Sequence, residues 1–345
     1  MNFVLSDECK KMIVECTGLT FLAENIERNF TVEDGAFVKA ILLFYATTAY
    51  NHDKVMDELL PLIKEENPDV DFETYEEVEI EFDQDAPIVA PDKIVTITTP
   101  EPITKQTEVV AKQAIFDDPK IADAAVAVVA DKISLQKGTV SGNIDKKTQG
   151  NAAIRLDGKK SVSVLIDGLV FDATAYNAIE VGLKSLPTSV IIRNVVFDKT
   201  LANNAISVFG MQEGGTILIE NCTFKDVSNC IRLSNKTNTH YSVIIRNCSC
   251  DKHDNQSDYA GIICMEDYTS KTAEDANTNK QFSLINIEIE DFVDFGEKLV
   301  QNEKLGLASG VADKDKQAYY VYYDATKAVV NASEHPDHYP TVVVK

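Results

Sequence analysis

The sequence predicts a mainly β protein in which a parallel β-helix follows a small N-terminal α-helical domain. The first observation behind this prediction is a segment that occurs four times. Its copies are residues 163–172 (SVLIDGLVFD), 189–198 (SVIIRNVVFD), 216–225 (TILIENCTFK) and 242–251 (SVIIRNCSCD). The steps of 26, 27 and 26 residues between them are typical of stacked supersecondary units. The second observation is a further strand-like segment after each copy, as in NAIEV at 177–181 and NAISV at 204–208.

Each copy has a bend between two short strands. Short runs of alternating β-branched residues favour strand over helix. The residue at the bend is Gly or Asn, and these two residues accept a left-handed backbone most cheaply. We assign this bend ladder to Gly168, Asn194, Asn221, Asn247 and Asn286, with Gly138 in the earliest and faintest copy. The first and third residues after the bend are apolar, so we expect them to stack inside the coils.

Stacked asparagines at a bend, with aliphatic and aromatic ladders inside, resemble the right-handed, pectate-lyase-like β-helix architecture. The resemblance covers residues 120–290. It implies a right-handed parallel β-helix in which each repeat contributes one coil. It does not imply one function, because this fold carries lyases, hydrolases, adhesins and phage spikes alike.

The rest of the chain divides around this repeat. We predict a helical docking domain at residues 1–64, an acidic linker at 65–92, the β-helix at 93–300 and a C-terminal cap or tail at 301–345. Phe37, Ile41 and Tyr45 repeat at helical spacing in the first segment. The linker contains the run ETYEEVEIEF, whose alternative interpretation is an edge strand that pairs with a partner. A β-helix exposes an unpaired coil at each end, so a cap is expected.

The composition argues against several kinds of partner. The net charge is −22 and no basic cluster is present, although Lys and Arg contacts to phosphate supply most nucleic-acid affinity. No apolar run is long enough to span a membrane, and the first residues lack the features of a secretory signal. We therefore expect free thiols at the seven cysteines. Cys222 and Cys248 occupy equivalent positions in adjacent copies, where a disulfide is the alternative.

Outward-facing positions are where catalytic groups of a β-helix would lie. Just before the bend, Asp167, Arg193, Glu220 and Arg246 alternate in charge, which predicts a ladder of ion pairs between coils. The second strand places Arg155, Glu180, Ser207, Arg232 and Ile263 outward, without a like-charged pair. A catalytic dyad needs two carboxylates without a cation between them. The sequence therefore predicts no catalytic residue, no cofactor site and no metal site. The loop at 251–258 and the pair His335 and His338 are interpreted as polar surface, and a metal site is the alternative at each.

One outward row is apolar. Leu165, Ile191, Leu218 and Ile244 lie three residues before the bend in successive copies, and Ser134 and Ser283 flank them. Exposed apolar rows of this kind mark surfaces that another chain or segment covers. We predict that this apolar stripe is either covered by the chain's own tail or linker, or forms a subunit interface.

A helical head, an acidic hinge and a β-helical shaft resemble phage β-helical spikes and head fibres. The resemblance implies a non-enzymatic virion structural protein, namely a capsid decoration, a head fibre or a tail-associated protein. It would be made in the host cytoplasm, contact capsid or tail proteins, and assemble as a homotrimer. The alternatives are a polysaccharide lyase or hydrolase and a non-catalytic glycan-binding β-helix. The charge of the protein argues against polyanionic substrates.

Overall fold

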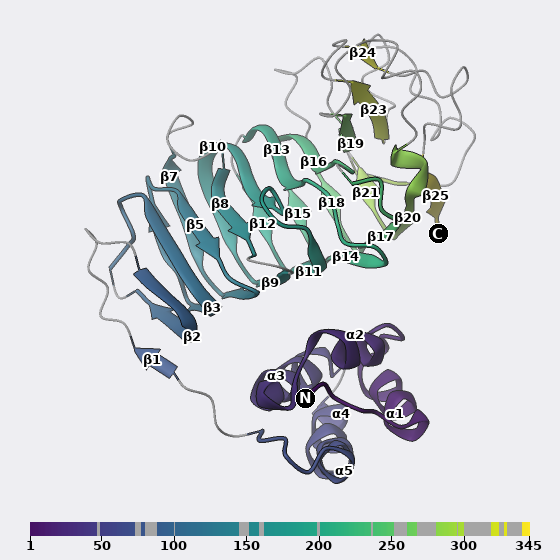
Figure 1. Cartoon of the computed structure of the whole chain (residues 1–345). Helices are drawn as coiled ribbons and strands as arrows, with labels where there is room; N and C mark the ends of the chain where they lie inside the picture. Colours follow the sequence, from purple (N-terminus) through teal and green to yellow (C-terminus); the bar gives the residue numbers. More distant parts are fainter. Residues whose placement is uncertain are drawn as a thin grey trace. The chain divides into compact units, whose positions relative to one another are not determined.

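The computed structural model of the chain describes residues 1–46, 49–72, 77–79, 88–99, 101–144, 152–158, 162–198, 201–235, 237–251, 261–267, 281–294, 296–299, 319–323, 328–329 and 340–345. The chain forms two compact units, Met1–Glu76 and Glu77–Lys345. Figure 1 shows a helical first unit and a second unit of stacked strands. None of the described helices is long and apolar enough to cross a membrane.

The first unit is a small bundle of helices. Its elements are α1 (Asp7–Thr17), α2 (Leu22–Asn29), η1 (Val32–Asp34), α3 (Gly35–Tyr45), α4 (Ala49–Lys54), η2 (Val55–Leu59) and α5 (Leu60–Glu66). Ser6 caps α1, because its hydroxyl accepts a hydrogen bond from the Cys9 N–H at 3.1 Å. Gly18 ends this helix in the left-handed conformation at φ 73°. The core of the unit includes the fully buried side chains of Ile13, Ile26 and Leu42.

Asn67 joins the start of this unit to its end. Its amide oxygen accepts a hydrogen bond from the Val4 N–H at 2.9 Å, and its Nδ2 donates to the Val4 carbonyl at 2.8 Å. Glu66 accepts another from the Ser6 N–H at 2.9 Å. Asn67 is buried, so these bonds satisfy polar groups that would be costly to leave unpaired. The residues before α1 are therefore an integral part of the unit.

The described part of the second unit consists mainly of strands. They are β1 (Glu77–Glu79), β2 (Ile88–Thr98), β3 (Thr107–Asp117), β4 (Lys120–Ala122), β5 (Val126–Val129), β6 (Lys132–Gln136), β7 (Thr139–Asn143), β8 (Ala152–Asp157), β9 (Val162–Asp167), β10 (Val170–Val181), β11 (Pro187–Arg193), β12 (Val196–Phe197), β13 (Leu201–Val208), β14 (Gly215–Glu220), β15 (Thr223–Phe224), β16 (Val227–Leu233), β17 (Tyr241–Arg246), β18 (Ser249–Cys250), β19 (Gly261–Asp267), β20 (Ile285–Glu290), β21 (Val293–Asp294), β22 (Glu297–Lys298), β23 (Tyr319–Tyr323), β24 (Ala328–Val329) and β25 (Thr341–Val344). A short helix, η3 (Gln281–Leu284), precedes β20.

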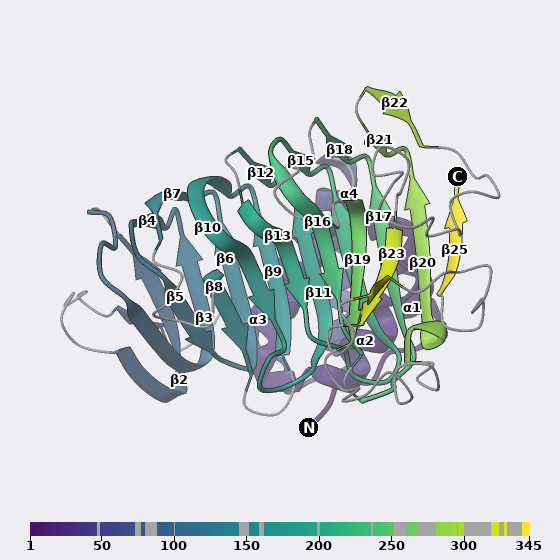
Figure 2. The same ribbon diagram turned by 90° about the horizontal axis from the view of Figure 1, so that it is seen from above.

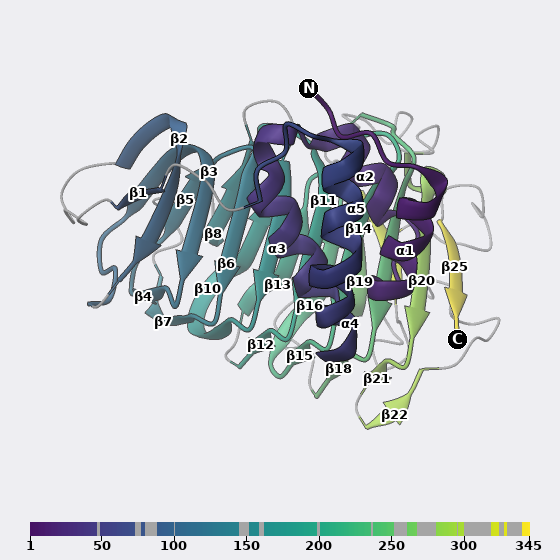
Figure 3. The same cartoon turned by 90° about the horizontal axis from the view of Figure 1, so that it is seen from below.

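β22 and β24 pair antiparallel with β21 and β23, and the other strands form three parallel ladders. The first joins β1, β2, β3, β6, β9, β11, β14, β17, β20 and β25. The second joins β4, β7, β10, β12, β15, β18 and β21. The third joins β2, β3, β5, β8, β10, β13, β16, β19 and β23. Figures 2 and 3 show the strands side by side from opposite directions. The second unit is a parallel β-helix, as the repeat predicts.

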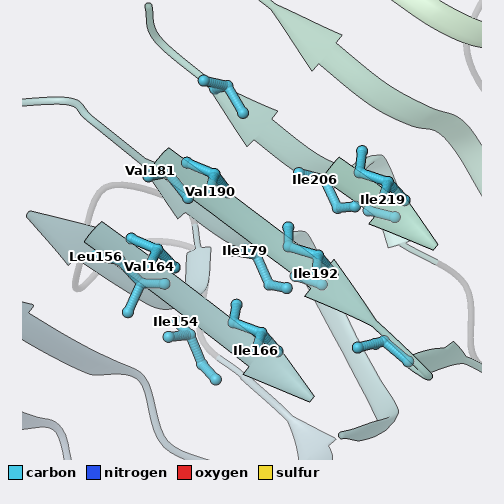
Figure 4. Packing of buried hydrophobic residues seen from close by; sticks show 14 of the residues in the cluster. Ile154, Leu156, Val164, Ile166, Ile179, Val181, Val190, Ile192, Ile206 and Ile219 are labelled. Atoms are coloured by element: carbon cyan, nitrogen blue, oxygen red, sulfur yellow. The ribbon is translucent and has the colours of Figure 1, made fainter. Parts of the chain in front are cut away.

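Like side chains stack in register inside the coils. β9, β11 and β14 align Val164, Val190 and Ile217 in one row and Ile166, Ile192 and Ile219 in the next. Figure 4 shows members of these rows packed against Ile154, Ile179 and Ile206 of the third ladder. In β9, buried and half-buried residues alternate along the strand. This alternation confirms the predicted inward set, and the buried aliphatic rows supply most of the stabilisation of the unit.

Aromatic rings form another row, at the third residue after the bend. The rings of Phe171 and Phe197 lie 5.2 Å apart between centroids, and those of Phe197 and Phe224 lie 4.9 Å apart. The interplanar angles are 13° and 3°, so the rings are stacked. In the next coil Cys250 takes the aligned position. The third residue after the bend therefore faces the interior, as predicted.

A left-handed residue marks the bend in successive coils. Gly168, Asn194, Asn221 and Asn247 have φ angles of 69°, 54°, 53° and 51°. Flanking coils bend at other residue types, namely Asp118 at 49°, Lys137 at 56° and Asp291 at 50°. The assignments of Gly138 and Asn286 to the bend ladder are therefore wrong.

The correction at Asn286 has a clear physical reason. Asn286 lies in β20 and aligns with Ser242, whereas Glu290 aligns with Arg246. Asp291 consequently follows the strand in the way that Asn247 does. The pairing is decided by the aliphatic residues of β20, which bury against the preceding coil. Aspartate tolerates the left-handed conformation better than most residues, so the bend persists without asparagine.

Short strands close both ends of the first ladder. β1 pairs in parallel with β2, so part of the run ETYEEVEIEF does form a strand, and it pairs within its own chain. At the other end β25 pairs in parallel with β20. The range 65–92, predicted as a linker, thus contains the end of α5, β1 and the start of β2. These added strands reduce the exposed backbone edge of the terminal coils.

Candidate functional site

Alternating charges line the outer side of the first ladder just before the bend. Asp167, Arg193, Glu220, Arg246 and Glu290 lie in register on successive coils. Ion pairs join Arg193 Nη2 to Asp167 Oδ2 at 3.5 Å and Arg246 Nε to Glu220 Oε1 at 2.6 Å. Partly exposed pairs of this kind contribute about 0–1 kcal/mol each. Their larger effect is on register, because skipping a coil would bring like charges together.

Two of the bend asparagines, Asn194 and Asn221, form a series of hydrogen bonds along the outside of the coils. Asn221 Nδ2 donates to Asn194 Oδ1 at 3.3 Å, and Asn194 Nδ2 donates to Asp167 Oδ1 at 2.7 Å. Every amide in this outer amide ladder points its N–H toward the earlier coil. The ladder ends on a carboxylate, which is the strongest acceptor available for its last donor.

A second amide ladder is buried in the third strand ladder, and the sequence reasoning missed it. Asn229 Nδ2 donates to Asn204 Oδ1 at 3.1 Å, and Asn204 Nδ2 donates to Asn177 Oδ1 at 3.0 Å. Asn177 Nδ2 in turn donates to Glu180 Oε1 at 2.7 Å. The three asparagines are at most 2% exposed. This buried amide ladder therefore runs toward the same coil as the outer one and also ends on an acid.

The outward row of the third ladder is buried rather than solvent-exposed. Arg155, Glu180, Ser207, Arg232 and Cys264 lie in register on successive coils. Cys264 takes the place predicted for Ile263, which lies in the core instead. Glu180 is 2% exposed, Ser207 0% and Arg232 3%. Charged side chains are almost never buried to this extent unless they are paired.

Contacts with other side chains offset part of the cost of burying these charges. Arg155 Nε lies 3.0 Å from Oδ2 of Asp157, a buried acid at the end of β8. The guanidinium carbon of Arg232 lies 4.6 Å from the centroid of the Phe209 ring, a cation–π arrangement. We call Arg155, Asp157, Glu180, Ser207 and Arg232 the buried polar cluster. The sequence reasoning overlooked Asp157, because it followed only the row that contains Arg155.

Glu180 is the chemically distinctive member of this cluster. Burial raises the pKa of its carboxyl, whereas the Asn177 hydrogen bond and the charges of Arg232 and Arg155 act in the opposite direction. Among the described residues, Glu180 Oε2 and Ser207 Oγ have no hydrogen-bond partner. A buried carboxyl with a raised pKa suits proton transfer, and it also suits the end of a hydrogen-bonded ladder.

The apolar stripe lies on the outer side of the first strand ladder. β9, β11, β14 and β17 align Leu165, Ile191, Leu218 and Ile244 in one row. Ser134 precedes the row, and Glu288 follows it in place of the predicted Ser283. Leu218 is 1% exposed and Ile191 is 9% exposed. That the row forms a subunit interface stays a prediction.

The other predicted polar positions lie largely outside the described residues. These are residues 252–260, which include most of the acidic loop, and the tail with His335 and His338. Within the part of the chain that the structure describes, no three His, Cys, Asp or Glu side chains gather in a way that could hold a metal ion.

Three parallel ladders, with rows of like side chains between coils, define this chain as a parallel β-helix protein. A scan against protein-family models and searches of curated proteins and of solved structures found no match. We therefore infer the function from the arrangement of side chains on the coils.

Proposed function

We propose that this chain is a non-enzymatic structural protein in which the β-helix serves as a rigid shaft and the helical unit attaches it to a larger assembly. The specific assembly that we propose is a virus particle, where the chain would act as a capsid decoration, head fibre or tail-associated protein. Its partners would then be capsid or tail proteins, and a homotrimer is the proposed assembly. The location in the virion follows from the same proposal.

The observation that carries this proposal is the use of polar side chains between coils. Both amide ladders and the alternating ion pairs join one coil to the next. Such contacts fix the register of the stack and make bending or slipping of single coils costly. A shaft needs this property, whereas a catalytic site needs polar groups that converge on a reacting molecule.

The separate helical unit supports the attachment role. It has its own buried core, and Asn67 ties its first residues to its last helix. A unit that closes on itself can bind a partner without disturbing the coils. Four of the large hydrophobic side chains that are exposed on the chain belong to it, namely Met1, Val4, Tyr50 and Met56. Exposed apolar side chains of this kind are candidates for the contact with a partner.

The direct test is the protein composition of particles made by a virus that encodes the chain. Mass spectrometry of purified particles should find the chain at a constant ratio to the major capsid protein after density-gradient purification. A chain that stays in the soluble fraction and is absent from the particles contradicts the proposal. The neighbouring genes offer a quicker check, because capsid and tail genes nearby favour the proposal.

A glycan-active enzyme, or a glycan-binding β-helix, is the second candidate. Glu180 favours it, because a buried carboxyl with a raised pKa is the property that a general acid needs. In a cleavage assay on neutral and acidic polysaccharides, wild-type activity that is lost in Glu180→Gln would place this candidate first. Binding without cleavage, measured by calorimetry, would indicate the glycan-binding form.

A further inference from the structure

Four cysteines of the β-helix core lie in two contacting pairs, and the proposed function makes no use of their thiols. Cys222 and Cys248 form one pair, in which the Cys222 N–H lies 3.4 Å from the Cys248 sulfur. Cys230 and Cys250 form the other through a side-chain hydrogen bond. All four are buried free thiols. A pair of thiols can be oxidised to a disulfide only if the geometry of the pair is suitable.

The first pair has the better geometry for a disulfide. Cys222 and Cys248 each follow a left-handed bend residue, Asn221 and Asn247, so they occupy equivalent positions on adjacent coils. Neighbouring parallel strands lie about 4.8 Å apart, which is within the ~4.4–6.8 Å between Cα atoms that a disulfide spans. Cys250, by contrast, aligns with Phe224, and its partner Cys230 lies in a different ladder.

The two thiols also differ in chemical character. Hydrogen bonding from Cys222, including the bond from its backbone N–H, lowers the pKa of Cys248. Burial raises the pKa of Cys222. Cys248 is therefore the better nucleophile of the pair, because the thiolate is the reactive form, and Cys222 is in place to resolve an oxidised intermediate.

We infer that Cys222 and Cys248 are an oxidation site whose disulfide links two adjacent coils. The oxidant is a peroxide, which is small and neutral enough to reach a buried thiol during local opening. The Cys248 thiolate attacks one peroxide oxygen, which gives a sulfenic acid and hydroxide. The Cys222 sulfur then attacks the sulfenic sulfur, the S–S bond forms and water leaves. Two thiols lose two electrons, and one hydrogen peroxide becomes two waters.

This inference is independent of the proposed function, because it concerns thiol chemistry of the folded chain alone. The test exposes the full chain to hydrogen peroxide and then counts thiols under denaturing conditions. We expect the count to fall from seven to five. We also expect the intact mass to fall by two hydrogens, and a peptide map should join the peptides of Cys222 and Cys248. Reduction should restore all thiols, and the oxidised protein should unfold at a higher denaturant concentration.

Two variants make the result specific. Cys222→Ala should keep its remaining thiols, or gain oxygen at Cys248, without any cross-linked peptide. Cys16→Ala, which removes a buried thiol of the helical unit, should still lose two thiols. A wild-type protein that keeps seven thiols overturns the inference, as does a disulfide between Cys230 and Cys250. The peptide map of the wild type decides the matter even where a variant does not fold.

Discussion

At the scale of single residues, the bend ladder shows how one backbone requirement selects side chains. Asn194 and Asn221 combine a left-handed backbone with an amide that reaches the neighbouring coil. Asp118, Lys137 and Asp291 meet only the backbone requirement at equivalent places. Asparagine is therefore used where both conditions apply, and other residues occur where the amide ladder ends.

The first prediction concerns Asn221, which has a φ of 53° and donates to Asn194. Asn221→Val should lower the free energy of unfolding by roughly 1–3 kcal/mol, through left-handed strain and a lost hydrogen bond. Urea denaturation measures the change. Asn221→Gly is the matched control, since it keeps the conformation and loses only the amide, so its cost should be smaller. Equal stability of the Val variant and wild type would contradict a stabilising role for the bend ladder.

The second prediction concerns Glu180, whose pKa is raised in the folded state by burial. Its contribution to stability is fully present below the unfolded pKa of about 4.3 and is lost as pH rises through the folded pKa. Relative to wild type, Glu180→Gln should thus gain stability as pH rises from about 4 toward 7. Denaturant titrations at several pH values measure the difference.

The control for Glu180 is Glu108→Gln, which changes an exposed acid on β3. Its stability relative to wild type should show little dependence on pH over the same window. A Glu180→Gln variant whose stability runs parallel to wild type at every pH would mean that folding does not raise the pKa of Glu180, which contradicts the prediction.

At the scale of elements, strand register depends on buried rows rather than on marker residues. The last recognisable copy of the repeat places Asn286 in β20 and Asp291 at the bend. The aliphatic rows pass from β17 to β20 without interruption, since Val243 aligns with Ile287 and Ile245 with Ile289. Moving the strand to place Asn286 at the bend would turn these buried residues away from the core.

The third prediction tests this register. Asn286→Val should leave the free energy of unfolding within about 0.5 kcal/mol, because the position is exposed and lies in a strand. Asp291→Val should cost roughly 1–3 kcal/mol, because valine is strained at a φ of 50°. The two variants are measured side by side in urea. The reverse order of costs would restore the bend to Asn286.

At the scale of the whole molecule, the apolar stripe decides how the outer side of the first strand ladder is used. Its four residues are aligned across adjacent coils, and Ser134 and Glu288 bound the row. An aliphatic row with polar ends is the pattern of a surface that is shielded from water. The oligomeric state of the protein in solution decides whether another subunit or a segment of the same chain covers the row.

The fourth prediction places a charge in this row. Leu218→Glu puts a carboxylate at a position that is 1% exposed, and desolvating it costs several kcal/mol or raises its pKa. If the row is a subunit interface, light scattering should show a folded protein of lower mass. If a segment of the same chain covers it, the mass should stay constant while stability falls and dye binding rises.

Thr216→Glu is the matched control, because it adds the same charge to the same strand at a half-buried position. It should change neither the mass nor the melting temperature of the protein. Unchanged mass, melting temperature and dye binding in Leu218→Glu would contradict both uses of the row.

The order of residues is enough to predict the coil repeat, the inward rows and the bends at Gly168, Asn194, Asn221 and Asn247. These features are local, because a period of two and a left-handed residue leave a direct trace in the order of residues. Repetition strengthened this trace, since each copy faces the same neighbours as the last.

The contacts between side chains of different coils, and the depth of their burial, depend on the folded arrangement of the coils. The buried amide ladder joins residues from three coils, from Asn229 through Asn204 and Asn177 to Glu180. No spacing within one copy of the repeat reveals the direction of its hydrogen bonds. Burial of Glu180, Ser207 and Arg232 on an outward row likewise cannot be read from the alternation of residues along a strand. Periodicity predicts the side of a strand on which a residue lies, but solvent access depends on everything that packs against that side.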